Sequence, residues 1–222
     1  MMFKIKRQPT RLALFIRWAQ FLFLALGILA LSCCAIVLID RWAFQAYQTR
    51  QFERALKDKK RSARDHSQAA SFYSQQEADR ARAESPAIKA VAGSPLGRIE
   101  ISSIGLAAMI SEGIDGKTLR LAVGHIPGTP LPGQRGNVGL AAHRDTFFRG
   151  LRNIHKDDEI ILTTLRGSFR YTVDSTQVVE PDDIKVLAPT EDDFLTLVTC
   201  YPFYFVGPAP QRFIVRAHRI FE

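Results

Sequence analysis

The segment from Trp18 to Ile39 runs for 22 residues without a charged side chain, and it constrains the fold more than any other part of the chain. At a rise of about 1.5 Å per residue, a helix of this length spans a hydrocarbon core about 30 Å thick. A cleavable signal peptide is the alternative, but its apolar region is usually only about 7–15 residues long. We therefore predict a retained transmembrane helix over 18–39, with Cys33 and Cys34 as small apolar residues within it, preceded by a basic N-terminus over 1–17.

The net charge of +8 is unevenly distributed along the 222 residues. Residues 1–64 contain 13 Lys and Arg against 3 Asp and Glu, a net +10, whereas residues 65–222 contain 17 against 19, a net −2. A phosphate-binding surface needs clustered Lys and Arg, so a nucleic-acid partner is excluded for the C-terminal part. The basic excess favours an anionic lipid bilayer as a partner. Basic residues flank the apolar segment on both sides, so their number does not decide which side faces the cytoplasm.

The segment after the apolar stretch is polar and lacks Pro and Gly as far as Glu84. Phe44, Tyr47, Phe52 and Leu56 recur in it at near-helical spacing, which predicts a helical stalk over 40–84 that spaces the following domain from the bilayer. Pro, Gly and Ser then appear in "ESPAIKAVAGSPLG", which indicates a linker over 85–96.

Residues 97–222 differ in composition from the polar segment before them. They contain short runs rich in Ile, Val, Thr, Leu and Phe, separated by turn residues. Examples are "GRIEIS", "NVGLAAH", "SFRYTVDSTQVV" and "RFIVRAHRI". About eight such runs in a segment of this length predict a small β-barrel or sandwich with short helical turns. The fold class is therefore mostly β.

Three side chains at predicted strand ends could share chemistry: His143, Cys200 and Arg212. If the strands before and after the Pro-rich loop pair as a hairpin, Cys200 and Arg212 meet at one rim. A thiol is mostly protonated at neutral pH, and a neighbouring imidazolium stabilises its thiolate. Arg is no base, but it can stabilise negative charge on a carbonyl oxygen. Together the three residue types suit acyl transfer through a thioester.

Each residue also has a purely structural interpretation. An unpaired Cys on an apolar strand is often a small buried hydrophobe, and a His at a strand end often only makes hydrogen bonds. The spacing of Cys and His does not fit a zinc site. No cofactor is predicted.

The pattern "TLVTC" ending at Cys200, followed twelve residues later by Arg212 in "QRFIV", resembles the active-site signature of the sortases. "NVGLAAHRDTFFRGL" resembles the sortase segment that bears the catalytic histidine. The resemblance covers essentially all of 97–222 and is strongest to class D. One departure is Ala142, where Gly often precedes the histidine.

The resemblance implies a closed eight-stranded sortase-type barrel and a cysteine transpeptidase that cleaves an LPxT-like sorting signal and transfers the protein to an amine of the cell envelope. Cys200 matches the nucleophile, His143 the general acid and base, Arg212 the oxyanion-stabilising group, and Thr199 a residue lining the substrate pocket. The resemblance also implies a cytoplasmic N-terminus and a catalytic domain on the extracytoplasmic side of the cell membrane.

The remaining candidates are weaker. His125 lies in a Gly- and Pro-rich loop and is predicted to be structural, and Asp145 is left out of the catalytic set. Some sortases bind calcium through carboxylates, but this sequence isolates no such cluster. Two alternatives to the transpeptidase stay open: a Cys/His hydrolase that uses water as its acceptor, and a catalytically silent membrane-tethered barrel that binds peptides.

Overall fold

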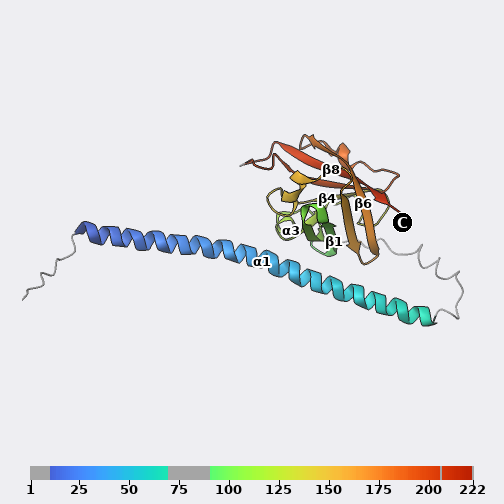
Figure 1. Cartoon of the computed structure of the whole chain (residues 1–222), viewed down its shortest axis with the longest axis horizontal. Coiled ribbons are helices and arrows are strands. Elements are labelled where there is room, and N and C mark those ends of the chain that lie inside the picture. The colour runs from blue at the N-terminus through green and yellow to red at the C-terminus, as the bar shows by residue number, and fades with distance from the viewer. Residues whose placement is uncertain (1–10, 70–90, 206, 222) are drawn as a thin grey trace, which may run out of the picture. The chain divides into compact units, whose positions relative to one another are not determined.

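The computed structural model describes residues 11–69, 91–205 and 207–221 (Figure 1). The chain divides into two compact units at the boundary between Ala43 and Phe44, and each is described by itself. Residues 1–10 of the predicted N-terminus, the end of the predicted stalk (70–84) and the first half of the predicted linker (85–90) lie outside the described residues.

Helix α1 extends over Arg11–Ala69. Its apolar part is long and apolar enough to cross a membrane, and it is the one such helix among the described residues. The large side chains from Phe15 to Trp42 are exposed, with Phe23 at 73% and Trp18 at 74% of full accessibility. A run of exposed apolar side chains on a helix with no charged residue from Trp18 to Ile39 suits a lipid environment. The predicted apolar helix is thus present as a candidate membrane span.

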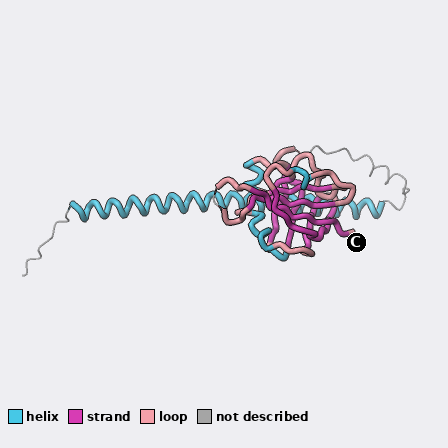
Figure 2. Tube along the Cα trace, turned by 90° about the horizontal axis from the view of Figure 1, so that it is seen from above, coloured by secondary structure: helices cyan, strands magenta, loops and turns pink. Residues whose placement is uncertain are grey.

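The second unit is built on a closed barrel of eight strands in the order β1-β2-β3-β4-β7-β8-β6-β5, as the prediction of a closed eight-stranded barrel required. Figure 2 shows the strands gathered together, with loops and short helices around them. The strands are β1 (Pro95–Ile101), β2 (Leu106–Glu112), β3 (Val123–His125), β4 (Asn137–Ala141), β5 (Glu159–Thr164), β6 (Gly167–Val179), β7 (Phe194–Tyr201) and β8 (Gln211–Ile220). Closure pairs both edges of every strand, which leaves no exposed edge for aggregation.

Two of the eight pairings are parallel, β2 with β3 and β4 with β7, and these need crossover connections. Helix α3 (Gly116–Leu121) makes the first crossover, and the Asp115 side chain caps it by accepting bonds from the backbone N–H groups of Lys117 and Thr118. These two bonds and one from the Thr118 hydroxyl lower the pKa of Asp115, with the hydroxyl as the largest cause. The second crossover contains the 3-10 helix η3 (Phe147–Asn153), the β5–β6 hairpin and the 3-10 helix η4 (Ile184–Leu187).

The core fills the barrel with side chains from alternate strand positions. The inward positions on the three strands that matter below are Val138, Leu140 and Ala142 beside β4, Leu195 and Leu197 on β7, and Val215 and Ala217 on β8. The residues between them along each strand point outward. This alternation decides which side chains can meet outside the barrel.

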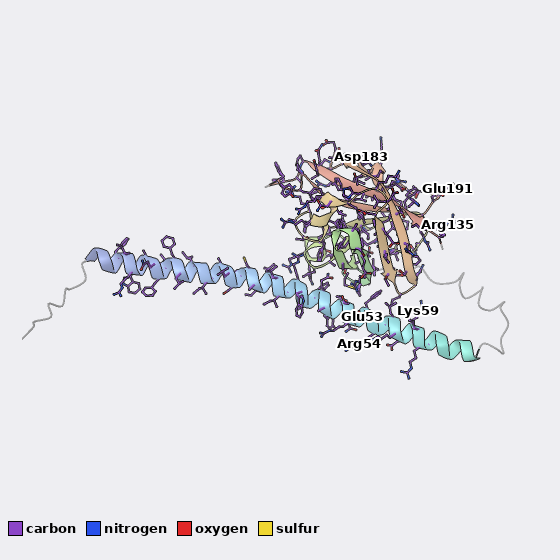
Figure 3. The ribbon with its side chains drawn as sticks, in the orientation of Figure 1. Glu53, Arg54, Lys59, Arg135, Asp183 and Glu191 are labelled. Atoms are coloured by element: carbon purple, nitrogen blue, oxygen red, sulfur yellow. The ribbon has the colours of Figure 1, made fainter. Side chains whose placement is uncertain are left out.

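The part of α1 that belongs to the second unit packs on the barrel. Phe52 is buried at 7% exposure, and the Gln45 amide accepts a bond from Met109 N at 2.9 Å and donates one to Leu121 O at 2.6 Å. Lys59, labelled in Figure 3, donates to the carbonyl of Leu165 at the β5–β6 turn. Tyr47 stays exposed, so the spacing of apolar residues identified only part of the face that packs. This segment, predicted as a stalk that spaces the domain from the bilayer, thus also packs on that domain.

Candidate active site

Cys200 lies at the end of β7, directly opposite Arg212 at the start of β8. Residues opposite each other in an antiparallel pair have side chains on the same face, with Cβ atoms about 4.5–5.5 Å apart. The neighbours Leu197 and Val215 face the core, so the alternation puts Cys200 and Arg212 on the outer face. The hairpin expected from the sequence therefore forms and brings these two residues together.

His143 follows the end of β4, the strand that runs parallel to β7. Every pair in that ladder, from Asn137 with Phe194 to Ala141 with Val198, differs by 57 residues, and His143 and Cys200 also differ by 57. The alignment continues past the strand, because Ala142 N donates to Val198 O at 3.3 Å and the Thr199 hydroxyl donates to Ala142 O at 2.8 Å. Ala142 belongs to the core, so His143 points outward, on the same side as Cys200.

The three side chains differ in exposure. His143 is exposed, Cys200 is a half-buried free thiol, and Arg212 is half-buried. The Arg212 guanidinium donates through Nη1 to Ala209 O at 3.3 Å and to Gln211 O at 3.0 Å. No hydrogen bond joins the three side chains to one another in the part of the chain that the structure describes. They share one open rim of the barrel, with the sulfur in the middle of three adjacent strands.

The outer face below this rim is closed by the connection between β6 and β7. Asn137 Nδ2 donates to the carbonyls of Val186 and Ala188, and its Oδ1 accepts from the Thr196 hydroxyl at 2.7 Å. A Cβ on Gly139 would lie 3.1 Å from side-chain atoms of Leu187, so glycine allows this close approach. The β4–β7 surface is therefore packed at one end and open at the end that carries His143 and Cys200.

Such a rim can support nucleophilic chemistry. An imidazole level with a thiol can take its proton, and the thiolate is the reactive form. A guanidinium across the hairpin can stabilise the oxygen of a carbonyl that the sulfur attacks. Two aromatic contacts stiffen the base of the rim: the rings of Phe203 and Phe213 lie 5.3 Å apart, and Tyr201 stacks on Phe213 at 6.3 Å.

The other predicted residues have different settings. Thr199 is buried at 2% exposure, and its hydroxyl donates a hydrogen bond to the Ala142 carbonyl. In the structure this side chain therefore joins β7 to the residue before His143. That Thr199 also binds substrate stays a prediction. His125 is buried, with Nδ1 2.7 Å from a Glu112 carboxylate oxygen and Nε2 3.0 Å from Pro130 O, which are structural contacts. Asp145 is exposed.

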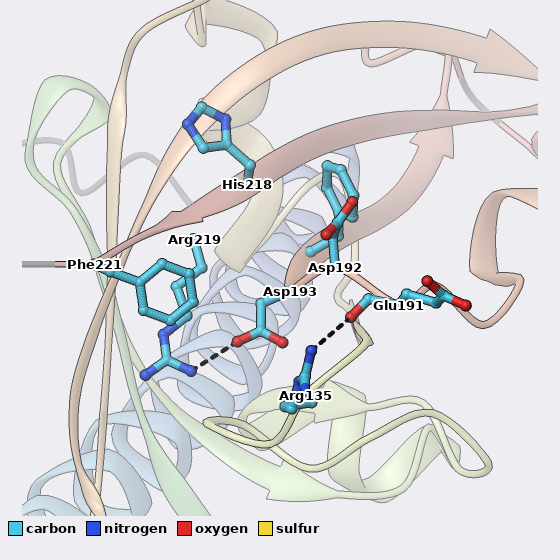
Figure 4. Close-up of a pocket in the computed structure, with 8 residues that line it drawn as sticks. Arg135, Glu191, Asp192, Asp193, His218, Arg219 and Phe221 are labelled. Atoms are coloured by element: carbon cyan, nitrogen blue, oxygen red, sulfur yellow. Dashed lines mark hydrogen bonds and ion pairs between the residues drawn. The ribbon is translucent and has the colours of Figure 1, made fainter.

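A pocket of about 510 Å³ opens at the opposite end of β7, next to Phe194 (Figure 4). Its wall contains the ion pair between Arg219 and Asp193, at 2.9 Å, and Arg135, whose Nη2 lies 3.5 Å from Glu191 O. None of the three candidate catalytic residues lines it. Among the described residues, no group of three or more His, Cys, Asp or Glu side chains is arranged to hold a metal ion.

Sequence reasoning overlooked Arg144, the residue after His143. Its guanidinium donates to three carbonyls of the β7–β8 connection, those of Pro202 at 3.0 Å, Phe205 at 2.7 Å and Gly207 at 3.1 Å. The sequence shows only that an arginine follows a candidate catalytic histidine and that a loop rich in Pro and Gly lies elsewhere in the chain. Carbonyl recognition by a side chain leaves no spacing pattern in a sequence.

The sortase domain model matches residues 99–220, more than half of the chain. The chain belongs to the sortase family. Among curated relatives, this sortase is 36% identical over 129 residues to sortase D of Bacillus subtilis, covering 58% of this chain and 65% of that protein. It is 28% identical over 109 residues to sortase A of Listeria monocytogenes, covering 47% of this chain and 49% of that protein. The chain thus spans less than two thirds of the length of these curated relatives.

Solved structures agree with the family. A sortase D5 transpeptidase from Clostridium perfringens is similar with a TM-score of 0.60 and 26% identity, covering 80% of this chain and 99% of that structure. Sortase C from Clostridium perfringens SM101 is similar with a TM-score of 0.57 and 28% identity, covering 71% and 97%. The likeness to sortase D proteins supports the class D prediction for this sortase.

Proposed function

We propose that this protein is a membrane-anchored cysteine transpeptidase that cleaves an LPxT-like sorting signal and transfers the protein to an amine of the cell envelope. The observation that carries the proposal is the common register of His143, Cys200 and Arg212 on the outer face of β4, β7 and β8. Membership of the sortase family supports the class of reaction.

In the first half-reaction, the Cys200 thiolate attacks the carbonyl carbon of the Thr in the sorting signal. Arg212 stabilises the oxyanion of the tetrahedral intermediate. The C–N bond then breaks, His143 gives a proton to the departing amine, and a thioester remains on Cys200.

In the second half-reaction, the acceptor amine attacks the thioester carbonyl and loses a proton to His143. The C–S bond breaks, and Cys200 leaves as a thiolate ready for another cycle. Water in place of the amine would give hydrolysis, so the acceptor decides between transfer and simple cleavage.

The proposal includes the organisation of the chain. Residues 1–17 would be a basic cytoplasmic segment, 18–39 the membrane span, 40–84 a helical segment, 85–96 a linker and 97–222 the catalytic barrel outside the cytoplasm. The apolar helix and the sortase match over 99–220 support this division. Thr199 is proposed to contribute to the wall of the substrate site.

The test uses the full chain in detergent micelles with a quenched fluorescent LPxT-like peptide and an added amine such as triglycine. We expect an amide product with triglycine, and an acyl-enzyme whose mass exceeds that of the protein by the N-terminal peptide fragment. Cys200→Ala should remove both while the barrel keeps its melting temperature. Full cleavage by the Cys200→Ala variant would refute the role of Cys200, and cleavage without any amide product would favour the hydrolase.

A further inference from the structure

The β7–β8 connection joins the strand that carries Cys200 to the strand that carries Arg212, and it is held from outside by Arg144. The three carbonyls that Arg144 binds, on Pro202, Phe205 and Gly207, lie in the first two thirds of the connection between the two strands. The guanidinium carbon also lies 5.8 Å from the centre of the Phe205 ring. An arginine presents five donors in a rigid planar fork, so it can hold several carbonyls in a fixed geometry, whereas a lysine has three donors on a compact ammonium group.

The far end of the same connection contacts the other arginine of the site. Arg212 Nη1 donates to Ala209 O in the loop and to Gln211 O at the start of β8, so the direction of the Arg212 guanidinium depends in part on where Ala209 lies. A chain of contacts therefore runs from the residue next to His143, through the loop backbone, to the group that faces Cys200 across the hairpin.

Besides the contacts of Arg144, the described residues in the middle of the loop have a backbone hydrogen bond from Phe205 N to Pro202 O at 3.4 Å. Tyr204 is 78% exposed and Phe205 is 44% exposed, so few apolar contacts order this part. Arg152 adds one contact, with its guanidinium carbon 5.4 Å from the centre of the Tyr204 ring. The aromatic contacts of Phe203 belong to the base of the loop, near β7. Arg144 is thus the main polar support of the loop's exposed middle among the described residues.

We propose that Arg144 is a positioning residue of the transfer reaction: it holds the β7–β8 connection so that Arg212 points at the carbonyl oxygen attacked by Cys200. This inference rests on the proposed transpeptidase function. Arg144 donates no proton and touches no reacting atom; it acts through the loop. Misplacing a catalytic group by about 1 Å can cost about 10²-fold in rate. The loss should fall on kcat, because oxyanion stabilisation operates in the transition state.

The experiment compares four single variants and one double variant of the full chain in detergent micelles: Arg144→Ala, Arg144→Lys, Arg212→Ala, Arg149→Ala and Arg144→Ala/Arg212→Ala. Arg149 is an exposed arginine of η3 in the same segment and serves as the matched control. The readouts are kcat and KM for amide formation from an LPxT-like peptide and triglycine, and hydrogen exchange of the amides between residues 203 and 211.

We expect Arg144→Ala to lower kcat about 10- to 100-fold and to change KM less than about 3-fold. Arg144→Lys should recover part of the lost rate, and Arg149→Ala should match the wild type. Because Arg144 acts through Arg212, the double variant should be no slower than Arg212→Ala alone. Amide exchange in the loop should rise in Arg144→Ala and stay unchanged in Arg149→Ala.

Three results would overturn the proposal. One is a wild-type kcat in Arg144→Ala; another is a multiplied loss of rate in the double variant; the third is unchanged loop exchange in Arg144→Ala. If Arg144→Ala does not fold, Arg144→Lys carries the same comparisons. A wild-type protein that forms no acyl-enzyme refutes the proposed function itself, whereas the exchange measurement still tests whether Arg144 orders the loop.

Discussion

The two ends of strand β7 use polar side chains in opposite ways. At its start, the Asp193 carboxylate accepts from Arg219 Nη1 (Figure 4) and from Gly136 N. The Arg219 guanidinium carbon also lies 4.7 Å from the centre of the Phe169 ring and 4.8 Å from that of the Phe221 ring. At its end, Cys200 and His143 share a face but make no bond with each other among the described residues. Both ends belong to the same strand and the same core.

We infer from this difference that the start of β7 contributes to stability and its end to the reaction. A buried charge with complete partners holds two elements in one geometry, and removing one partner leaves the other charge uncompensated. A thiol and an imidazole without mutual bonds keep their donors and acceptors available for a substrate. We therefore expect substitutions at the start of β7 to change the free energy of unfolding, and substitutions at its end to change the reaction rate.

The largest effect is expected for His143→Gln. Glutamine keeps the size and polarity but cannot transfer a proton, so kcat/KM for amide formation should fall about 10³-fold. The melting temperature should stay within about 2 °C of the wild type, because His143 is exposed and lies outside the core. Peptide turnover and differential scanning fluorimetry measure the two quantities. His155→Gln serves as the control and should leave both unchanged; a His143→Gln variant that unfolds early would remove the distinction between the two ends.

The next effect is expected for Asp193→Ala at the other end. Asp193 is 9% exposed, and its loss leaves Arg219 without its carboxylate and Gly136 N without an acceptor. The free energy of unfolding should fall by about 3 to 4 kcal/mol in urea titration. The folded fraction should keep the wild-type kcat. Glu191→Ala, an exposed neighbour in the same pocket, is the matched control and should change stability by less than about 0.5 kcal/mol.

Alkaline pH should weaken the same end of the barrel through Tyr171. Burial raises the pKa of this phenol from its ordinary 10.0 to about 12, and its hydroxyl has no hydrogen-bond partner among the described residues. The folded state thus binds the proton more tightly than the unfolded state. The free energy of unfolding should therefore be unaffected by Tyr171 below pH 10, and it should fall by about 2 to 3 kcal/mol as the pH rises from 10 to 12 and the phenol ionises more readily in the unfolded chain. Tyr171→Phe loses no hydrogen bond and should show a shallower decline of stability over this range; an identical decline would assign the effect to other groups.

The smallest effect is expected for Thr199→Val, which should change both the stability and the reaction rate. The change preserves volume but leaves the Ala142 carbonyl without the bond that extends the β4–β7 alignment to His143. Stability should fall by about 1 kcal/mol, and kcat should fall several-fold. Thr199→Ser keeps the hydroxyl and should recover most of the rate. If Thr199→Val raises KM sharply with kcat unchanged, Thr199 acts on substrate binding and not on alignment.

Much of this architecture was predictable from the chain itself. The charge-free stretch after Arg17 predicted the apolar helix. The short runs of Ile, Val, Thr, Leu and Phe after Gly97 predicted a small barrel or sandwich. The Cys200–Arg212 pairing followed from a hairpin, because two successive antiparallel strands place the end of the first opposite the start of the second. The match to sortases then fixed the closed form of the barrel.

Other features left no local signal in the sequence. The alignment of His143 with Cys200 depends on a parallel pairing across a long crossover, and no turn sets that register. Thr199 and Arg144 bind backbone carbonyls, which every residue carries, so their partners could not be read from residue types. Gln45 was not predicted to pack on the barrel for the same reason. Its amide binds the backbone of Met109 and Leu121, whereas the helical spacing was carried by aromatic and aliphatic residues.

The parallel contact between β4 and β7 also has a consequence for biogenesis. Its partners are separated by 57 residues that include a complete hairpin, so loop closure delays this pairing relative to local contacts. Until the barrel closes, Cys200 is an ordinary thiol with no imidazole beside it. In the proposed mechanism, the Cys200 thiol would thus gain its neighbouring imidazole only when folding is complete.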